Sequence, residues 1–348
     1  MTELIVQQLV NWVTLGCIYA LLAIGFSLIF GVLNVIHFSH GDVAMTSPFI
    51  ALAAAQALAI AIGVSGPVWL IVSACIAVFA VGLIGVILDK VVIRRFRDAP
   101  AMMALVATVA LGIVIRELIR HLYPQGSNPH AFPRLASGVA LEIAGVQVGW
   151  FTLLVVALTL VLVVLLFAFL RLTPLGLRIR AASEDRIVAR MMGIRDTRVF
   201  RATFFVASAI GAIAGLLFAS YAGVTRFDFG VMAGLLGFSA AVIGGLGSMP
   251  GAILGGLIIA GIEVLAQTFV LFSQPSHKQR LPSAPGKNRT GCRLRTGGPA
   301  SGGAGYSLTG STSKASQSFS PTASRFRRRW HCSEEKAIRR CSPISKGC

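Results

Sequence analysis

Several side chains that could do chemistry cluster in one short segment of an otherwise apolar stretch of sequence. The segment contains Asn34, His37, Ser39, His40, Gly41 and Asp42. Polar groups at membrane depth are tolerated mainly when they are buried in protein or line a water-filled path. The two histidines could bind a metal, relay protons, line a substrate path, or hydrogen-bond backbone groups that a broken helix leaves free. We predict that the segment lines a translocation path.

The elements that position this segment are membrane helices. The chain is 55% hydrophobic and only 13% charged, with a mean hydropathy of +0.78. An apolar run of about 20 residues can span a bilayer as a helix. Such runs occur at 8–33, 43–63, 68–89, 101–120, 149–170, 202–223, 229–247 and 251–272. The sequence therefore predicts an all-α polytopic membrane bundle of about eight helices, with broken or re-entrant segments.

The loops between these runs differ in charge. Residues 89–98 carry four basic side chains and residues 171–201 carry eight arginines, whereas 121–148 carries only Arg134. Basic loops remain on the cytoplasmic side of the membrane. We therefore expect the first two loops to be cytoplasmic and the third to be external.

A second interruption, rich in glycine, lies in the other half of the chain. Its predicted path residues are Gly244, Gly245, Gly247 and Ser248. Paired interruptions in two halves of a membrane protein point to a transport site near the midplane. We expect the 37–42 and 244–248 segments to approach each other.

Charged side chains inside the apolar runs need an explanation. Glu263 lies mid-run, where a charge costs about 2.5 to 3.5 kcal/mol or more. It is expected either to satisfy the broken backbone at 244–247 as a neutral acid, or to line the path. Arg116, Glu117 and Arg120 are expected to snorkel toward the outer surface.

The basic loop at 171–201 is too polar to span and too helix-prone to be a passive linker. Pro174 and Gly176 mark its start, and Ser183, with Asp185 and Arg186, could cap a short helix that ends near Gly193. The loop is either a docking surface or a solvated basic connection.

Three stretches together resemble a known family. The loop residues Gly176, Arg180, Ala181, Ala182, Asp185, Ala189, Gly193 and Ile194 resemble the coupling loop of permease subunits in bacterial branched-chain amino-acid ABC importers. H-F-S-H-G-D at 37–42 is similar to a segment of the same family. So is I-G-G-L-G-S-M-P-G-A-I-L-G-G at 243–256, with Glu263 in the helix that follows. The resemblance covers residues 1 to about 270 in the right order.

The resemblance implies a multi-pass inner-membrane permease, at 1–273, that translocates branched-chain or other hydrophobic amino acids. It implies a second related permease subunit, two cytoplasmic ATPase subunits and a periplasmic substrate-binding protein, within membrane lipid. The sequence contains no G-x-x-x-x-G-K-[ST] motif, and Gly286-Lys287 lacks its other residues. We therefore expect a transport subunit and not an enzyme, with ATP bound by its partners, and no cofactor, metal or nucleic acid bound by this chain.

Three other functions stay open. They are a permease for urea or short amides, a secondary transporter that uses the buried histidines and Glu263 for ion coupling, and a non-functional truncated paralogue. The loop at 171–201 favours an ATP-driven importer over a secondary transporter, which has no use for an ATPase docking surface.

The last segment, 274–348, differs in composition from the rest. It holds +13 of the formal charge of +18, is rich in Pro, Ser, Gly and Thr, and lacks an apolar run. We expect it to be disordered. Family members end in a further apolar helix, so we infer a shifted reading frame or a disrupted gene near Phe272. Arg325–Trp330 could instead bind nucleic acid or anionic lipid, but the expected external location opposes both roles.

Overall fold

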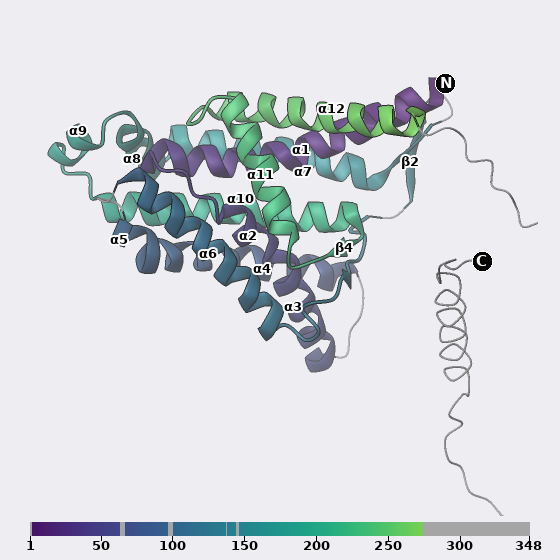
Figure 1. Ribbon diagram of the computed structural model, residues 1–348, viewed down its shortest axis with the longest axis horizontal. Helices are drawn as coiled ribbons and strands as arrows, with labels where there is room; N and C mark the ends of the chain where they lie inside the picture. Colours follow the sequence, from purple (N-terminus) through teal and green to yellow (C-terminus); the bar gives the residue numbers. More distant parts are fainter. Residues whose placement is uncertain (1, 63–66, 97–99, 137, 144–145, 274–348) are drawn as a thin grey trace, which may run out of the picture. The chain divides into compact units, whose positions relative to one another are not determined.

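The computed structural model describes residues 2–62, 67–96, 100–136, 138–143 and 146–273, and these are mostly helical (Figure 1). The long helices are α1 (Thr2–Leu33), α3 (Ser47–Ile62), α4 (Pro67–Leu88), α6 (Ala101–Leu122), α7 (Trp150–Leu172), α10 (Asp196–Ala222), α11 (Phe229–Ile243) and α12 (Met249–Ser273). The short ones are α2 (His40–Met45), the π-helical turn η1 (Asp89–Ile93), α5 (Arg94–Phe96), α8 (Pro174–Glu184) and α9 (Arg186–Met191). The predicted tail at 274–348 lies outside the described residues.

Seven helices in the described part of the chain are long and apolar enough to cross a membrane. The polytopic helical bundle predicted from the sequence is thereby confirmed, with one difference. The apolar run at 229–247 forms only the 15 residues of α11, which are too few for a full span. Its last residues are glycine-rich, and Gly245 and Gly247 adopt positive φ angles that end the helix.

Helix α1 lies at the centre of the bundle and contacts α7, α10, α11 and α12. In the most apolar stretch of α1, 83% of the residues are buried. In the corresponding stretches of α6, α7 and α12, only 22% are buried. Small residues let α12 approach α1 closely, because a Cβ at Gly256 would overlap the backbone of Ala20. The outer helices expose apolar side chains such as Met102, Leu160 and Phe269, as expected for surfaces in contact with lipid.

The two basic loops lie at the same end of the bundle. Figure 1 shows α5, α8 and α9 at one end of the long helices and β2 and β4 at the other. The strands β1 (His130–Ala131) and β4 (Val224–Thr225) pair antiparallel, as do β2 (Val139–Ile143) and β3 (Val146–Gly149). Arg94 of the first loop and Arg190 of the second line the same shallow pocket, so the two loops are neighbours. This arrangement agrees with the charge asymmetry of the sequence.

The 171–201 loop forms two helices and not the single one expected. Thr173 caps α8, accepting a hydrogen bond from the Gly176 N–H at 3.0 Å. Ser183 continues this helix and donates to the Arg180 carbonyl at 2.7 Å, so it is not the cap of α9. Asp185 is that cap, because its carboxylate accepts from the N–H groups of Ile187 and Val188.

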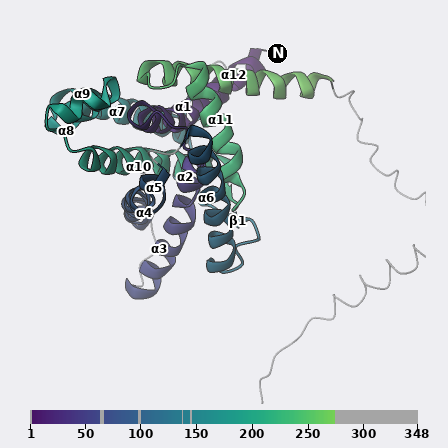
Figure 2. The same ribbon diagram turned by 60° about the vertical axis from the view of Figure 1, so that its left-hand side comes forward.

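All six residues of α2 are buried, and this short helix forms a wedge inside the bundle (Figure 2). It contacts α10 on one side and α11 on another. A Cβ at Gly41 would overlap the backbone of Gly230 and Gly234 in α11. Backbone-to-backbone contact of this kind allows no side chain between the helices.

Gly41→Ala is therefore expected to destabilise the folded protein by about 1 to 3 kcal/mol, the usual cost of overpacking. Gly149→Ala serves as the control, since a Cβ there meets nothing closer than 3.6 Å. The thermal unfolding midpoint in detergent measures both. Equal midpoints for the two variants would contradict the packing of α2 against α11.

Candidate functional site

Asn34 ends α1 and begins the break in the helix. It adopts a left-handed φ of 55°, and its N–H donates to the Phe30 carbonyl at 2.7 Å. Asparagine is one of the few non-glycine residues that tolerate this conformation. Asn34 is exposed. Its role in this structure is to end α1 through its backbone conformation.

His37 lies in the break between α1 and α2, and His40 is the first residue of α2. His40 is fully buried beside Gly25 of α1 and Gly211 of α10, with its ring edge-to-face with Phe26 at 4.8 Å. Neither of its ring nitrogens has a hydrogen-bond partner in the described part of the chain. His37 shares a 3.1 Å hydrogen bond with Ser39. Within the described ranges no three His, Cys, Asp or Glu side chains gather as a metal site requires.

Asp42 forms an ion pair across the bundle with Arg116 of α6. Oδ1 of Asp42 and Nε of Arg116 are 3.4 Å apart, and the side chains are 7% and 25% exposed. The carboxylate fits a notch between Gly112 and Gly230, where a Cβ would meet its oxygens. The expectation that Arg116 snorkels to the surface is therefore wrong, because a buried carboxylate offers it a closer partner than the surface does.

The glycine-rich break connects α11 to α12. Gly244 packs on the backbone of Gly251, and Gly247 lies beside Gly31 near the end of α1. Ser248 is exposed, and its hydroxyl accepts a hydrogen bond from the Gly251 N–H at 3.3 Å. No hydrogen bond or ion pair joins this segment to 37–42, although the structure describes both. The expectation that the two segments approach each other is wrong, because they lie at opposite ends of α11. Gly41 contacts the first turns of this helix, and Gly244 follows its last residue.

One expectation was that Glu263 satisfies the broken backbone at 244–247. The structure shows that it does not. It accepts a hydrogen bond from the Tyr19 hydroxyl at 2.7 Å and another from Gln267 at 3.3 Å. The expectation fails because Glu263 lies several turns along α12 from the 244–247 break. Its partner Tyr19, buried in α1, had not been identified from the sequence.

Among the residues that resemble a coupling loop, some are buried and anchor the loop, and others are exposed. Gly176 packs against the backbone of Leu170, and Ala182 and Ala189 are buried, whereas Arg180 and Ala181 are exposed. Gly193 has a φ of 81°, and the N–H of Ile194 donates to the Ala189 carbonyl, which closes the end of α9.

Asp196, which sequence reasoning overlooked, ties α9 to the start of α10. Its carboxylate accepts from Arg186 at 3.2 Å and from Arg190. Arg186 also lies over the Phe200 ring, 5.0 Å from its centroid.

The tip of α9 exposes a group of large apolar side chains, namely Ile187, Val188, Met191 and Met192, with exposures of 52% to 82%.

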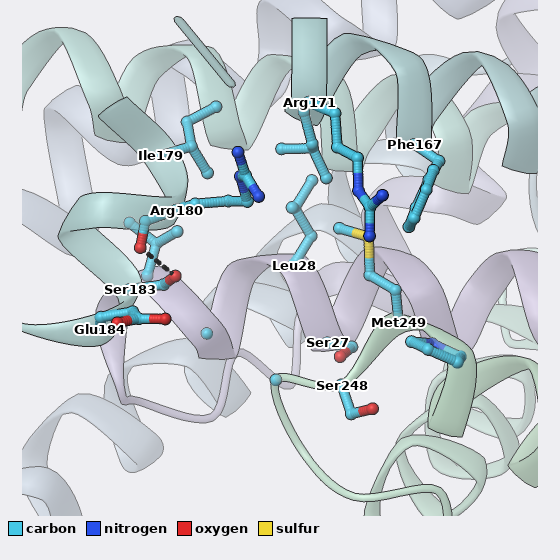
Figure 3. A pocket seen from close by; sticks show the side chains of 15 residues that line it. Ser27, Leu28, Phe167, Arg171, Ile179, Arg180, Ser183, Glu184, Ser248 and Met249 are labelled. Atoms are coloured by element: carbon cyan, nitrogen blue, oxygen red, sulfur yellow. Dashed lines mark hydrogen bonds between the residues drawn. The ribbon is translucent and has the colours of Figure 1, made fainter. Parts of the chain in front are cut away.

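Residues of α8 and of the glycine-rich break line a single pocket of about 330 Å³ (Figure 3). One wall is α8, with Arg180, Ser183 and Glu184, and another is formed by Ser248 and Met249. Ser27 and neighbouring residues of α1 lie between these walls. Two segments that the sequence treats separately thus line one cavity.

The sequence of this chain is similar to those of known proteins. Residues 8–284 match the family model of the branched-chain amino acid transport system permease component. The high-affinity branched-chain amino acid transport system permease protein LivH of Escherichia coli K12 is 32% identical over 235 residues, covering 65% of this chain and 74% of LivH. BraD of Pseudomonas aeruginosa, a permease protein of the same description, is 30% identical over 230 residues with the same coverage.

No solved structure gives a significant match. The family match covers most of the chain, and the seven apolar helices agree with it. The chain therefore belongs to the family of permease components of branched-chain amino-acid transport systems, and is a multi-pass protein of the bacterial inner membrane.

Proposed function

We propose that this chain carries branched-chain or other hydrophobic amino acids through the membrane as one of two related permease subunits. Two cytoplasmic ATPase subunits drive it, and a periplasmic binding protein delivers the substrate. The proposal rests on its membership of the family and on one structural observation, the exposed apolar tip of α9 on a firmly anchored loop. Urea or short amides remain the alternative substrates.

The α8–α9 loop has the properties of a docking surface for an ATPase. Its apolar tip residues are exposed at the end of the bundle that carries the basic loops. A solvated connection has no need of four adjacent exposed apolar side chains. The loop is also fixed to the membrane helices, because Gly176 of α8 packs against α7 and Asp196 of α10 binds Arg186 of α9. Movement of a bound ATPase would therefore be transmitted to α7 and α10.

The α2 wedge has the properties of a gate. His37 Nδ1 and both ring nitrogens of His40 are buried without a hydrogen-bond partner among the described residues. A buried polar group in that state costs about 1 to 3 kcal/mol. This cost is relieved if the segment becomes hydrated when the path opens. We propose that the wedge closes the path in this conformation, and that ATPase movement, passed through α10, opens it.

Replacing both Met191 and Met192 by Asp should lower ATP-driven leucine uptake about tenfold or more, because docking loses the burial of two large apolar side chains, each worth about 1.5 to 3 kcal/mol. Membrane abundance should not change, since the two side chains are 82% and 79% exposed. The double Leu variant is the matched control and should retain uptake. Normal uptake by the Asp variant would contradict ATPase docking at α9.

Cysteine accessibility tests the gate. In a background without native cysteines, Ser248→Cys should react with a water-soluble thiol reagent at rest, because Ser248 is exposed. Ser39→Cys should react only during turnover, because Ser39 is fully buried. Equal labelling of Ser39→Cys with and without ATP, or none under either condition, would contradict a gate at this segment.

A double-mutant cycle tests the Asp42–Arg116 pair. Asp42→Asn and Arg116→Gln should each lower stability and uptake, because each leaves a partly buried charge unpaired. The double variant should lose less stability than the sum of the two, with a coupling of about 0.5 to 3 kcal/mol in the unfolding free energy. The control is the pair Glu117 and Arg120, 3.5 Å apart and about half exposed, with an expected coupling below about 1 kcal/mol. Simple additivity for Asp42 and Arg116 would show that the pair does not hold the wedge.

A further inference from the structure

The pocket between the coupling loop and the glycine-rich break has features of a ligand site that the transport function alone does not require. It lies between α7 and the start of α12, with α1 between them and α8 at its end (Figure 3). Its volume of about 330 Å³ is at the lower limit of the roughly 300 to 1,000 Å³ typical of small-molecule sites. A molecule as small as a single amino acid would fit.

The pocket offers a cation and an anion that do not pair with each other. Arg180 and Glu184 are one turn apart on α8, a spacing at which opposite charges commonly form an ion pair. Both instead extend toward the pocket (Figure 3). No ion pair of either side chain occurs within the described residues. Their charges are therefore available to a ligand that carries both signs.

A buried hydroxyl points to the same ligand. Ser27 of α1 is 1% exposed and lines the pocket, and its Oγ has no hydrogen-bond partner in the part of the chain that the structure describes. A buried hydroxyl without a partner is costly. A carboxylate in the pocket would accept its hydrogen bond.

The remaining lining is apolar. Leu28 and Val32 of α1, Ile179 of α8 and Leu170 of α7 are buried side chains that line the pocket. The second arginine of the lining, Arg171, has its guanidinium over the Phe167 ring, 4.1 Å from the centroid. Apolar surface beside a separated cation and anion matches an α-amino acid with an apolar side chain.

We infer that this pocket binds a free apolar amino acid from the cytoplasmic side, with the carboxylate at Arg180 and Ser27 and the ammonium at Glu184. The inference rests on the proposed function, because it assigns to the transported class of molecule a site at the cytoplasmic end. Glu184 disfavours inorganic phosphate and anionic lipid, which it would repel. Occupancy would hold α8 against Ser248 and the start of α12, so an accumulated amino acid would slow its own import.

Equilibrium binding of radiolabelled L-leucine to the purified full-length chain, without ATPase or binding protein, tests the inference. We expect saturable binding with a Kd near or below about 1 mM. 4-Methylpentanoate lacks the ammonium and 3-methylbutylamine lacks the carboxylate, so neither should compete. Arg180→Gln, Glu184→Gln and Ser27→Ala should each weaken binding, the first two by about tenfold or more. Arg178→Gln, on the same helix but outside the pocket lining, is the control and should bind normally.

The outcomes separate this inference from the proposed function. ATP-driven import without leucine binding to the isolated chain would overturn the inference and leave the function intact. Binding that persists in both Arg180→Gln and Glu184→Gln would also overturn it. So would displacement of leucine by phosphatidylethanolamine or phosphatidylglycerol but not by excess unlabelled leucine, which would assign the pocket to lipid. Failure of import with normal leucine binding would count against the proposed function alone.

Discussion

Helix ends at membrane depth have no water to satisfy their backbone groups, and the whole arrangement around α2 depends on this constraint. The chain leaves α1 at Asn34 and re-enters a helix at His40, so the break must be covered by protein. Glycines make that possible: Gly25, Gly211 and Gly230 let α1, α10 and α11 close around the imidazole of His40 and the carboxylate of Asp42. The same close packing makes the wedge a feature that can move only if α10 or α11 moves.

The second break follows the same logic at the end of the bundle that carries the basic loops. There the ends of α11 and α12 pack backbone to backbone through Gly244 and Gly251, and α8 faces them across a pocket. Helix α10 starts at Asp196, which holds α9, and passes the α2 wedge further along its length. In the proposed mechanism, a displacement of the α8–α9 loop would therefore be transmitted to both breaks.

The sequence predicted the helical bundle, both breaks and the basic loops, because hydropathy, glycine clusters and charge asymmetry are local patterns. It did not predict the pairing of Arg116 with Asp42 or of Glu263 with Tyr19, since these residues lie on separate helices and meet only through the packing of the bundle. Ser183 and Asp185 are both good helix caps. The choice of Asp185 follows from α8 continuing through Ser183 while it buries Ile179 and Ala182. Apolar composition likewise did not reveal how short α11 is.

In the proposed mechanism, import is powered by ATP hydrolysis in partner subunits that dock at α8–α9, and not by an ion gradient acting on the buried histidines. The most direct measurement is leucine uptake into proteoliposomes that contain this chain with its sister permease, the two ATPases and the binding protein. Uptake should require hydrolysable ATP and the binding protein, and it should persist when ionophores collapse proton and sodium gradients. Uptake that follows an imposed ion gradient in vesicles without the ATPases would contradict the account.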